Sequence, residues 1–187
     1  MKSTIIKKNK INTRELLLDS AFKTFYKYGF QGANIATILT EVGINKGSMY
    51  HFFKSKKELG LAVIEERIER NLELKYNQIF EQNDSFKVLF DVLRSAPETL
   101  IYGCPLNKMS QEMLYLDENF KRVLAKAYIT FESMVIKIVQ QTNTIDVERK
   151  AKLIIATYEG ALMSYHLNKN REEFQEILTT LERTISE

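Results

Sequence analysis

The spacing of apolar residues is the feature that most constrains the fold of this chain. In almost every long segment, apolar side chains recur at intervals of three and four residues rather than two, which is the periodicity of one face of an α-helix. Only two prolines and seven glycines interrupt the 187 residues, and apolar residues make up 44% of them, enough for a folded core. The pattern therefore predicts an all-α protein of about nine helices.

Three helices are predicted in the first 55 residues. They run from Asn12 or Thr13 to Gly29, from Ile35 to Val42, and from about Asn45 to Phe52 or Phe53. The second and third are about two turns long and are joined by a tight turn at Gly43, as in a helix-turn-helix. We therefore predict a three-helix, DNA-binding domain over residues 1–55.

Longer helices are expected in residues 56–187. Ser55 followed by Glu58 is a capping box, and it opens the longest helix, from Lys56 to about Gln82. Asp84 offers another helix cap, and Pro97, Gly103 and Pro105 break the region between Ala96 and Leu106. Further helices are predicted at about 117–141, 146–168 and 172–185. We assign residues 56–187 to a second, helical domain.

Charge is distributed unevenly along the chain. Residues 1–60 carry eleven lysines and arginines against four acidic residues, a net charge of +7, so the overall +3 leaves −4 for the remainder. A basic first third suits a surface that faces phosphates, although an uneven solvated surface is the alternative. The single cysteine, Cys104, excludes an intrachain disulfide, and with only two histidines a structural metal is not expected. We expect no membrane span, no secretory signal and no cofactor, and therefore a cytoplasmic protein.

Residues 43–59 are the most informative stretch. They read Gly-Ile-Asn-Lys-Gly-Ser-Met-Tyr-His-Phe-Phe-Lys-Ser-Lys-Lys-Glu-Leu, with small residues for close approach, hydroxyl and amide groups for hydrogen bonds, and lysines at both ends. Together with Gly29-Phe30, Ile38 and the first-helix residues Arg14, Leu17, Ala21 and Phe25, this stretch resembles the N-terminal signature of the TetR family of regulators. The resemblance implies a ligand-responsive, sequence-specific transcriptional regulator, by the habit of the family a repressor. It also implies that the second domain, residues 56–187, binds a ligand and forms the dimer.

The resemblance, together with the charge pattern, gives a set of candidate DNA contacts. The set is Lys10, Arg14, Asn34, Thr37, Asn45, Lys46, Gly47, Ser48, Tyr50, His51, Lys54 and Lys56. Ala33 and Ala36 depart from the family pattern, which weakens the second helix as a source of backbone contacts, and Asn34 is expected to replace the missing cap. Tyr50 and Gly47 also admit a purely structural interpretation, as a packing aromatic and as a site of close helix packing.

A second motif lies at the break between helices. Gly103-Cys104-Pro105-Leu106-Asn107 with Glu112 is similar to a pattern in a subset of TetR-like regulators, and such a break is a reasonable lip for a pocket. The candidate lining residues are Phe90, Tyr102, Cys104, Met109, Met113, Tyr128, Phe131 and Tyr158. Ordinary core packing is the favoured explanation for each of them taken separately. A helix that begins after Pro105 would favour a reactive Cys104 thiolate. The expected effector is a small, largely apolar molecule, or a reagent that modifies Cys104.

A homodimer is expected because one short recognition helix covers only a few base pairs of a palindromic or near-palindromic operator. The family pairs its last two long helices with those of a second copy. Two apolar stripes are candidates for this interface, although each helix must also cover its own core: Val147, Ala151, Ile154, Ile155, Tyr158, Leu162 and Tyr165, and Phe174, Ile177, Leu178, Leu181 and Ile185. Gly160, Ala161 and Ser164 would permit close approach.

Two other classes of protein are weighed against a regulator. A helical enzyme would need a metal motif, a glycine-rich phosphate loop or a nucleophile beside a base, and the sequence offers none of these. A helical adaptor that binds protein is opposed by the lysines around Gly47 and Lys56. Salt-dependent binding to duplex DNA separates an adaptor from a regulator.

Overall fold

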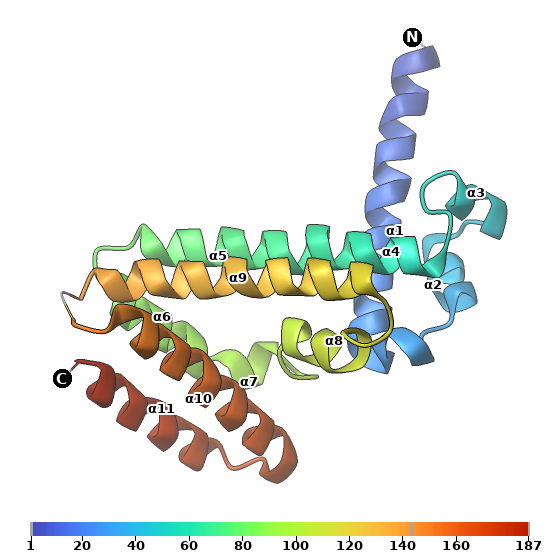
Figure 1. Cartoon of the computed structure of the whole chain (residues 1–187). Helices are drawn as coiled ribbons and strands as arrows, with labels where there is room; N and C mark the ends of the chain where they lie inside the picture. Colours follow the sequence, from blue (N-terminus) through green and yellow to red (C-terminus); the bar gives the residue numbers. More distant parts are fainter. Residues whose placement is uncertain (1, 143, 187) are drawn as a thin grey trace. The chain divides into compact units, whose positions relative to one another are not determined.

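The computed structural model describes residues 2–142 and 144–186, with side chains from Thr13 onward, and in this part of the chain all regular secondary structure is helical (Figure 1). The predicted fold class is therefore confirmed. The chain divides into two compact units, the first made of residues 1–68 and 108–124 and the second of residues 69–107 and 125–187. No helix in the described part is long and apolar enough to cross a membrane.

The first unit contains the predicted helix-turn-helix. Its N-terminal helices are α1 (Lys2–Gly32), α2 (Ile35–Val42), α3 (Lys46–Tyr50) and α4 (Lys56–Val63). Helix α1 packs against α2 and α4, and α2 packs against α3. The predicted start of the first helix near Asn12 is wrong, because helical backbone already begins at Lys2. The capping signal at Asn12 is weaker than the tendency of the preceding lysines to continue a helix.

The ends of these helices follow the chemistry of their capping residues. Asn34 caps α2 by accepting a hydrogen bond from the amide of Ala36, and Ser55 caps α4 through the amide of Glu58. Gly43 ends α2 in the left-handed region, with φ of 72°. Helix α1 contains a break at Gly29, whose φ of 77° and ψ of 162° lie outside the helical region. The predicted boundaries of α2 and the predicted caps at Asn34, Gly43 and Ser55 are thus confirmed.

An aromatic cluster forms part of the core of the first unit. The ring of Phe30 lies 5.3 Å from that of Phe25 and 5.1 Å from that of Phe120, both in edge-to-face arrangements. Gly60 of α4 faces this cluster, and a Cβ atom at that position would lie 2.7 Å from the Phe30 ring. Only glycine therefore allows α4 to approach Phe30 this closely.

The helix that opens at Lys56 is continuous to Phe80, as predicted, but it is not α-helical throughout. Between α4 and α5 (Arg70–Phe80), residues Ile64–Glu69 form a π-helix, η1. The wider turn of the π-helix changes which residues share one face of the helix, and a uniform period of 3.6 residues did not predict this change. In the first unit, Arg67 of η1 forms ion pairs with Asp19 and Glu15 of α1, each at 2.7 Å.

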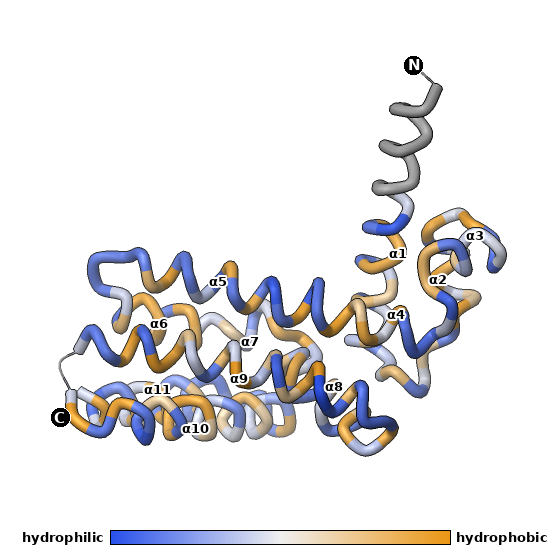
Figure 2. The backbone as a smooth tube through the Cα atoms, turned by 45° about the horizontal axis from the view of Figure 1, so that its top comes forward, coloured by the Kyte–Doolittle hydropathy of each residue, from blue (hydrophilic) through white to orange (hydrophobic). Residues whose placement is uncertain are grey.

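The second unit is a bundle of longer helices. They are α5, α6 (Ser85–Arg94), α7 (Ala96–Thr99), most of α9 (Glu118–Gln140), α10 (Val147–Asn168) and α11 (Arg171–Ser186). Helix α8 (Pro105–Met113) and helix α9 each contribute residues to both units. Helix α11 packs against α10 and α6, and α7 packs against α6 and α10. Figure 2 shows hydrophobic positions recurring along these helices, as expected for amphipathic helices around a core.

The two apolar stripes predicted for α10 and α11 face mainly their own core. Ala151, Ile154, Ile155, Tyr158 and Leu162 are buried in α10, and Phe174, Leu178, Leu181 and Ile185 are buried in α11. Val147, Tyr165 and Ile177 are half-buried. Because each helix must cover the core of its own unit first, the strongest apolar periodicity marks that core. The buried members of these stripes are therefore not available to an interface with another molecule.

Candidate nucleic-acid interface

Helix α3 separates apolar anchors from a polar outer face. Met49 and Phe53 are 1% and 2% exposed, so one side of the segment is fixed in the core of the first unit. On the other side, Lys46, Gly47, Tyr50 and His51 are exposed. Lys46 and Tyr50 lie one turn apart, and the Lys46 ammonium lies 5.9 Å from the centre of the Tyr50 ring. This arrangement agrees with a recognition helix held by apolar side chains.

Tyr50 is 47% exposed. This exposure argues against the alternative that Tyr50 is a packing aromatic, because a core aromatic would be buried. Gly47 is also exposed, and a Cβ atom added there would have the side chain of Asn45 as its nearest contact, at 3.3 Å. Close packing of helices does not explain Gly47.

Two of the predicted polar contacts also have roles within the turn. The Asn45 side-chain oxygen accepts hydrogen bonds from the Ser48 amide at 2.8 Å and from the Ser48 hydroxyl at 3.1 Å. Asn34 is exposed and caps α2, and Thr37, one turn along α2, is exposed as well. Lys54 is exposed, and its backbone amide donates to the Glu58 carboxylate at 2.7 Å. Asn45 and Asn34 thus serve first to hold the helix-turn-helix in shape.

Lys56 and Arg14 have partners inside the first unit. The Lys56 ammonium donates to the backbone oxygens of Ala33 at 2.7 Å and Gln31 at 3.2 Å, and burial lowers the pKa of this lysine. The Arg14 guanidinium donates to Glu66 at 2.8 Å and lies 5.3 Å from the Phe53 ring. A phosphate contact by either residue would compete with these bonds. The side chain of Lys10 lies outside the described residues.

The candidate ligand-binding residues fall into both units. Met109 and Met113 belong to the first unit, whereas the other six belong to the second. Phe90, Phe131 and Tyr158 are at most 5% exposed, as are Met109 and Met113, so core packing accounts for these five. Tyr102 and Tyr128 are 37% and 42% exposed. The residues predicted to line one pocket are therefore divided between the two compact units.

Cys104 lies in a polar cluster of the second unit. Burial, and then the negative charge of Glu159, raise the pKa of the Cys104 thiol well above its usual range. The backbone amides of Asn107 and Leu106, at the start of α8, act in the opposite direction but are outweighed. The start of this helix therefore favours the thiolate, as predicted, but its effect is smaller than that of burial and of Glu159, which comes from α10 and is remote in sequence.

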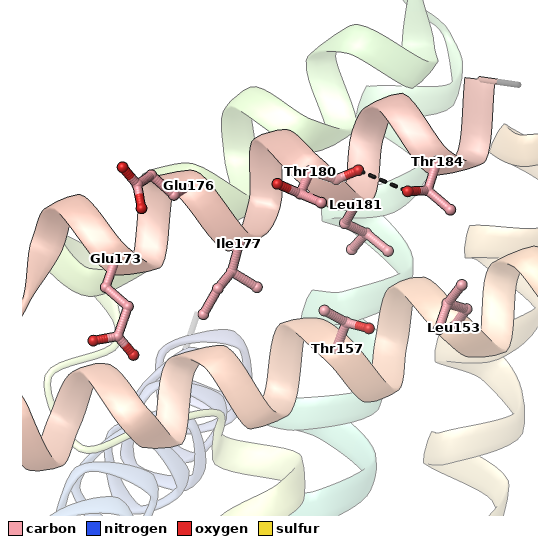
Figure 3. A pocket seen from close by; sticks show the side chains of 8 residues that line it. All are labelled: Leu153, Thr157, Glu173, Glu176, Ile177, Thr180, Leu181 and Thr184. Atoms are coloured by element: carbon pink, nitrogen blue, oxygen red, sulfur yellow. Dashed lines mark hydrogen bonds between the residues drawn. The ribbon is translucent and has the colours of Figure 1, made fainter.

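Two shallow grooves are found along α11 in the second unit. One, of about 470 Å³, lies between α10 and α11, where Leu153 and Thr157 face Ile177 and Leu181 (Figure 3). The other, of about 550 Å³, lies beside α6 and is lined by charged and polar residues such as Asp84, Glu182 and Arg183. None of the candidate ligand-binding residues lines either groove.

Two acidic residues hold basic or backbone groups of the first unit and were not singled out from the sequence for these roles. Glu66 binds Arg14, and Glu112 accepts hydrogen bonds from the backbone amides of Phe30 and Gln31. Glu112 stands in the second motif, but its spacing from Cys104 carries no information about a partner more than 80 positions away. Only the folded chain reveals the contact.

Comparison with known proteins agrees with this geometry. Residues 17–63 match the model of the bacterial regulatory proteins, tetR family. The chain is 29% identical over 185 residues to an uncharacterized helix-turn-helix-type transcriptional regulator of Lactococcus lactis subsp. lactis, covering 92% of this chain and 94% of that protein. It is 23% identical over 192 residues to the transcriptional repressor NemR of Escherichia coli (strain K12), covering 94% of each.

Solved structures share the fold over nearly the whole chain. A TetR transcriptional regulator from Chloroflexus aurantiacus J-10-FL superimposes with a TM-score of 0.83 at 26% identity, covering 96% of this chain and 97% of that one. The match of residues 17–63 contains the whole helix-turn-helix and its exposed recognition face. These similarities support the assignment of the chain to the TetR family of bacterial transcriptional regulators.

Proposed function

We propose that this protein is a repressor that binds a palindromic operator and releases it when a small molecule binds among the helices of the second unit. The exposed face of α3 over its buried anchors carries the DNA-binding part of the proposal. Residues 1–55 form the DNA-binding domain and residues 56–187 the regulatory and dimerisation domain. The protein works in the cytoplasm, where its operator lies.

Lys46, Tyr50 and His51 are the contacts that the surface geometry favours most. All three are exposed: Lys46 and Tyr50 share one side of α3, and His51 is its C-cap residue. A lysine near a phosphate adds electrostatic attraction, whereas a tyrosine or histidine adds hydrogen bonds to phosphates or base edges. Gly47, Ser48, Lys54, Asn34 and Thr37 flank these residues. Arg14 and Lys56 contribute to the shape of the surface through their internal bonds.

The dimer is proposed to form through the outer faces of α10 and α11. Family members bind operator DNA as homodimers. The outer side of α10 carries an exposed row of apolar and small residues at helical spacing: Leu153, Ala156, Gly160, Met163 and Leu167. A Cβ atom added to Gly160 would meet nothing within 4 Å, so the row is open to a neighbour. The groove between α10 and α11 continues this surface (Figure 3).

Two routes of release remain, and the surroundings of Cys104 favour one of them. A half-buried thiol with a raised pKa is mostly protonated at neutral pH, and the thiol is a far weaker nucleophile than the thiolate. Binding of a small molecule is therefore the preferred route, and modification of Cys104 is the second candidate. The half-exposed Tyr102 and Tyr128 are the positions that a ligand reaches first.

Selection from a randomised duplex pool tests the DNA-binding part. The recovered duplex should be bound with an affinity that falls steeply between 50 and 200 mM salt, by roughly three orders of magnitude for six or more phosphate contacts. Lys46→Ala should weaken binding and lower the salt slope by about one, and Tyr50→Ala should cost about 1–3 kcal/mol. Lys121→Ala is the matched control, because Lys121 is an exposed lysine of α9. Recovery of no common sequence would refute the proposal.

Release is tested with the same duplex. A screen of small apolar molecules should find compounds that lower the DNA affinity of the wild-type protein and of Cys104→Ser alike. An alkylating electrophile should release DNA only if the second route operates, and then only from the protein that retains Cys104. Equal release from Cys104→Ser and wild type by an electrophile would exclude the cysteine route.

A further inference from the structure

The turn between α1 and α2 is held by two side chains that come from other helices. One Glu112 carboxylate oxygen accepts the backbone amide of Phe30 at 2.7 Å, and the other accepts that of Gln31 at 2.5 Å. The Lys56 ammonium donates to the backbone oxygens of Gln31 and Ala33. We call residues 29–33 with these four hydrogen bonds the clamped turn. Its backbone is bound on its amide side by a carboxylate and on its carbonyl side by an ammonium group.

Gly29 makes this contact possible in two ways. Its φ of 77° breaks the helical course of α1 and directs the amides of Phe30 and Gln31 to the carboxylate. A Cβ atom at this position would lie 2.6 Å from a Glu112 carboxylate oxygen, well inside contact distance. Any other residue would therefore displace Glu112 and strain the backbone together.

The clamped turn sets where α2 begins. The amide of Ala33 bonds back to the oxygen of Gly29 at 3.1 Å, and Asn34 follows as the cap of α2. Helix α2 in turn packs against α3, which carries Lys46 and Tyr50. Hydrogen bonds to a charged acceptor are stronger than those to a neutral one, so the carboxylate of Glu112 restrains this joint firmly.

Glu112 is carried by a helix that is also bonded within the second unit. The side-chain amide of Asn107 donates to the Glu159 carboxylate of α10 at 2.8 Å. Asn107 and Glu112 are five residues apart in α8, about 7.5 Å along its axis. Helix α8, which begins directly after Cys104, thus carries one polar bond in each unit.

We propose that Glu112 is a positioning residue for DNA binding, and that α8 links the Asn107–Glu159 bond of the second unit to the clamped turn. A change around Glu159 shifts α8, the carboxylate leaves the amides of Phe30 and Gln31, and α2 and α3 lose their fixed position. The link to release rests on the proposed function. The role of Glu112 at the turn does not, and can be measured without DNA.

Amide hydrogen exchange of Phe30 and Gln31, followed by NMR on the intact protein, tests the clamp. In Glu112→Gln the amide group of the new side chain cannot accept both bonds, so exchange at the two positions should accelerate at least tenfold. Asp117→Asn is the matched control, because it removes one carboxylate of the first unit, bonded to Lys57 at 2.6 Å, and keeps a capping side chain for α9. Unchanged exchange in Glu112→Gln, or equal acceleration in Asp117→Asn, overturns the proposal.

The link through α8 is tested from its other end. Asn107→Ala removes the bond to Glu159 and leaves Glu112 in place, so accelerated exchange at Phe30 and Gln31 supports the link, and unchanged exchange overturns it. Affinity for the selected duplex should fall about tenfold in Glu112→Gln, at a temperature where circular dichroism shows full helicity. Affinity equal to that of wild type in Glu112→Gln, with accelerated exchange, overturns the positioning role. If no duplex is recovered at all, the exchange results still decide the clamp.

Discussion

Three basic residues show that the surroundings of a side chain decide whether it is available to contact DNA. Lys46, Arg14 and Lys56 are all predicted from the sequence to contact DNA. Lys46 is exposed, whereas Arg14 is bound to Glu66 and Lys56 to the backbone of the clamped turn. The type of each residue sets its charge. The groups that bind Arg14 and Lys56, and so compete with a DNA phosphate, come from segments 52 and 23 positions away.

The reactivity of Cys104 is predicted to depend on Glu159. Because the carboxylate of Glu159 contributes to the raised thiol pKa, Glu159→Gln should lower that pKa and speed alkylation of Cys104 at a given pH. Mass spectrometry of iodoacetamide-treated protein over a pH series measures the rate. Glu132→Gln is the control, since it removes another carboxylate of the second unit. Equal rates in wild type and Glu159→Gln would contradict the assigned role of Glu159.

His166 is predicted to make stability depend on pH. Burial, and then the charge of Lys169, lower its pKa from the ordinary 6.5. A group with a lowered pKa in the folded state binds more protons when unfolded, so its contribution is full above about pH 6.5 and is lost as the pH falls through the folded value. Denaturation by urea should show a smaller loss of unfolding free energy between pH 7.5 and 5.5 for His166→Asn than for wild type. A larger loss in the variant would reverse the sign and reject this explanation.

At the scale of helices and turns, local chemistry explains where most elements begin and end. The caps at Ser55 and Asp84 accept the amide hydrogen bonds that their positions predict. The exceptions have longer-range causes. The π-helical segment Ile64–Glu69 lies where Arg67 pairs with α1, and the break at Gly29 lies where Glu112 approaches. Such positions depend on neighbours that the local sequence does not contain.

Gly29→Ala is predicted to destabilise the first unit. The substitution places a Cβ in the left-handed region, which costs about 1–2 kcal/mol, and brings it within 2.6 Å of the Glu112 carboxylate. Gly32→Ala is the matched control, because its Cβ would meet nothing within 4 Å. Urea denaturation should show a loss for Gly29→Ala and little change for Gly32→Ala. Similar unfolding free energies for the two variants would contradict the tight fit at Gly29.

At the scale of the whole molecule, the outer face of α10 is the surface that we propose for binding a second copy. The strongest apolar stripes of α10 and α11 are buried in the second unit. Met163 and Leu167, 58% and 76% exposed, extend the row that contains Gly160. A dimer joined along this row carries two recognition helices, one for each half of a palindromic operator.

Met163→Glu is predicted to weaken the dimer. Burying a carboxylate without a partner in an apolar interface is costly, so the variant should shift towards the mass of a single 21.8 kDa chain in sedimentation velocity. Ile129→Glu is the control, because Ile129 is an equally apolar, exposed residue of α9. Dissociation caused by Ile129→Glu rather than by Met163→Glu would move the interface to α9.

The sequence by itself determined the helical class, most helix boundaries and the recognition motif. Each of these depends on interactions between residues a few positions apart: periodic burial, side-chain caps and the turn at Gly43. The tertiary structure alone decided which apolar faces are core, that burial and Glu159 raise the pKa of the Cys104 thiol, and that Glu112 and Lys56 hold the turn before α2. The physical reason is that burial, pKa and polar pairing depend on groups brought together from distant parts of the chain.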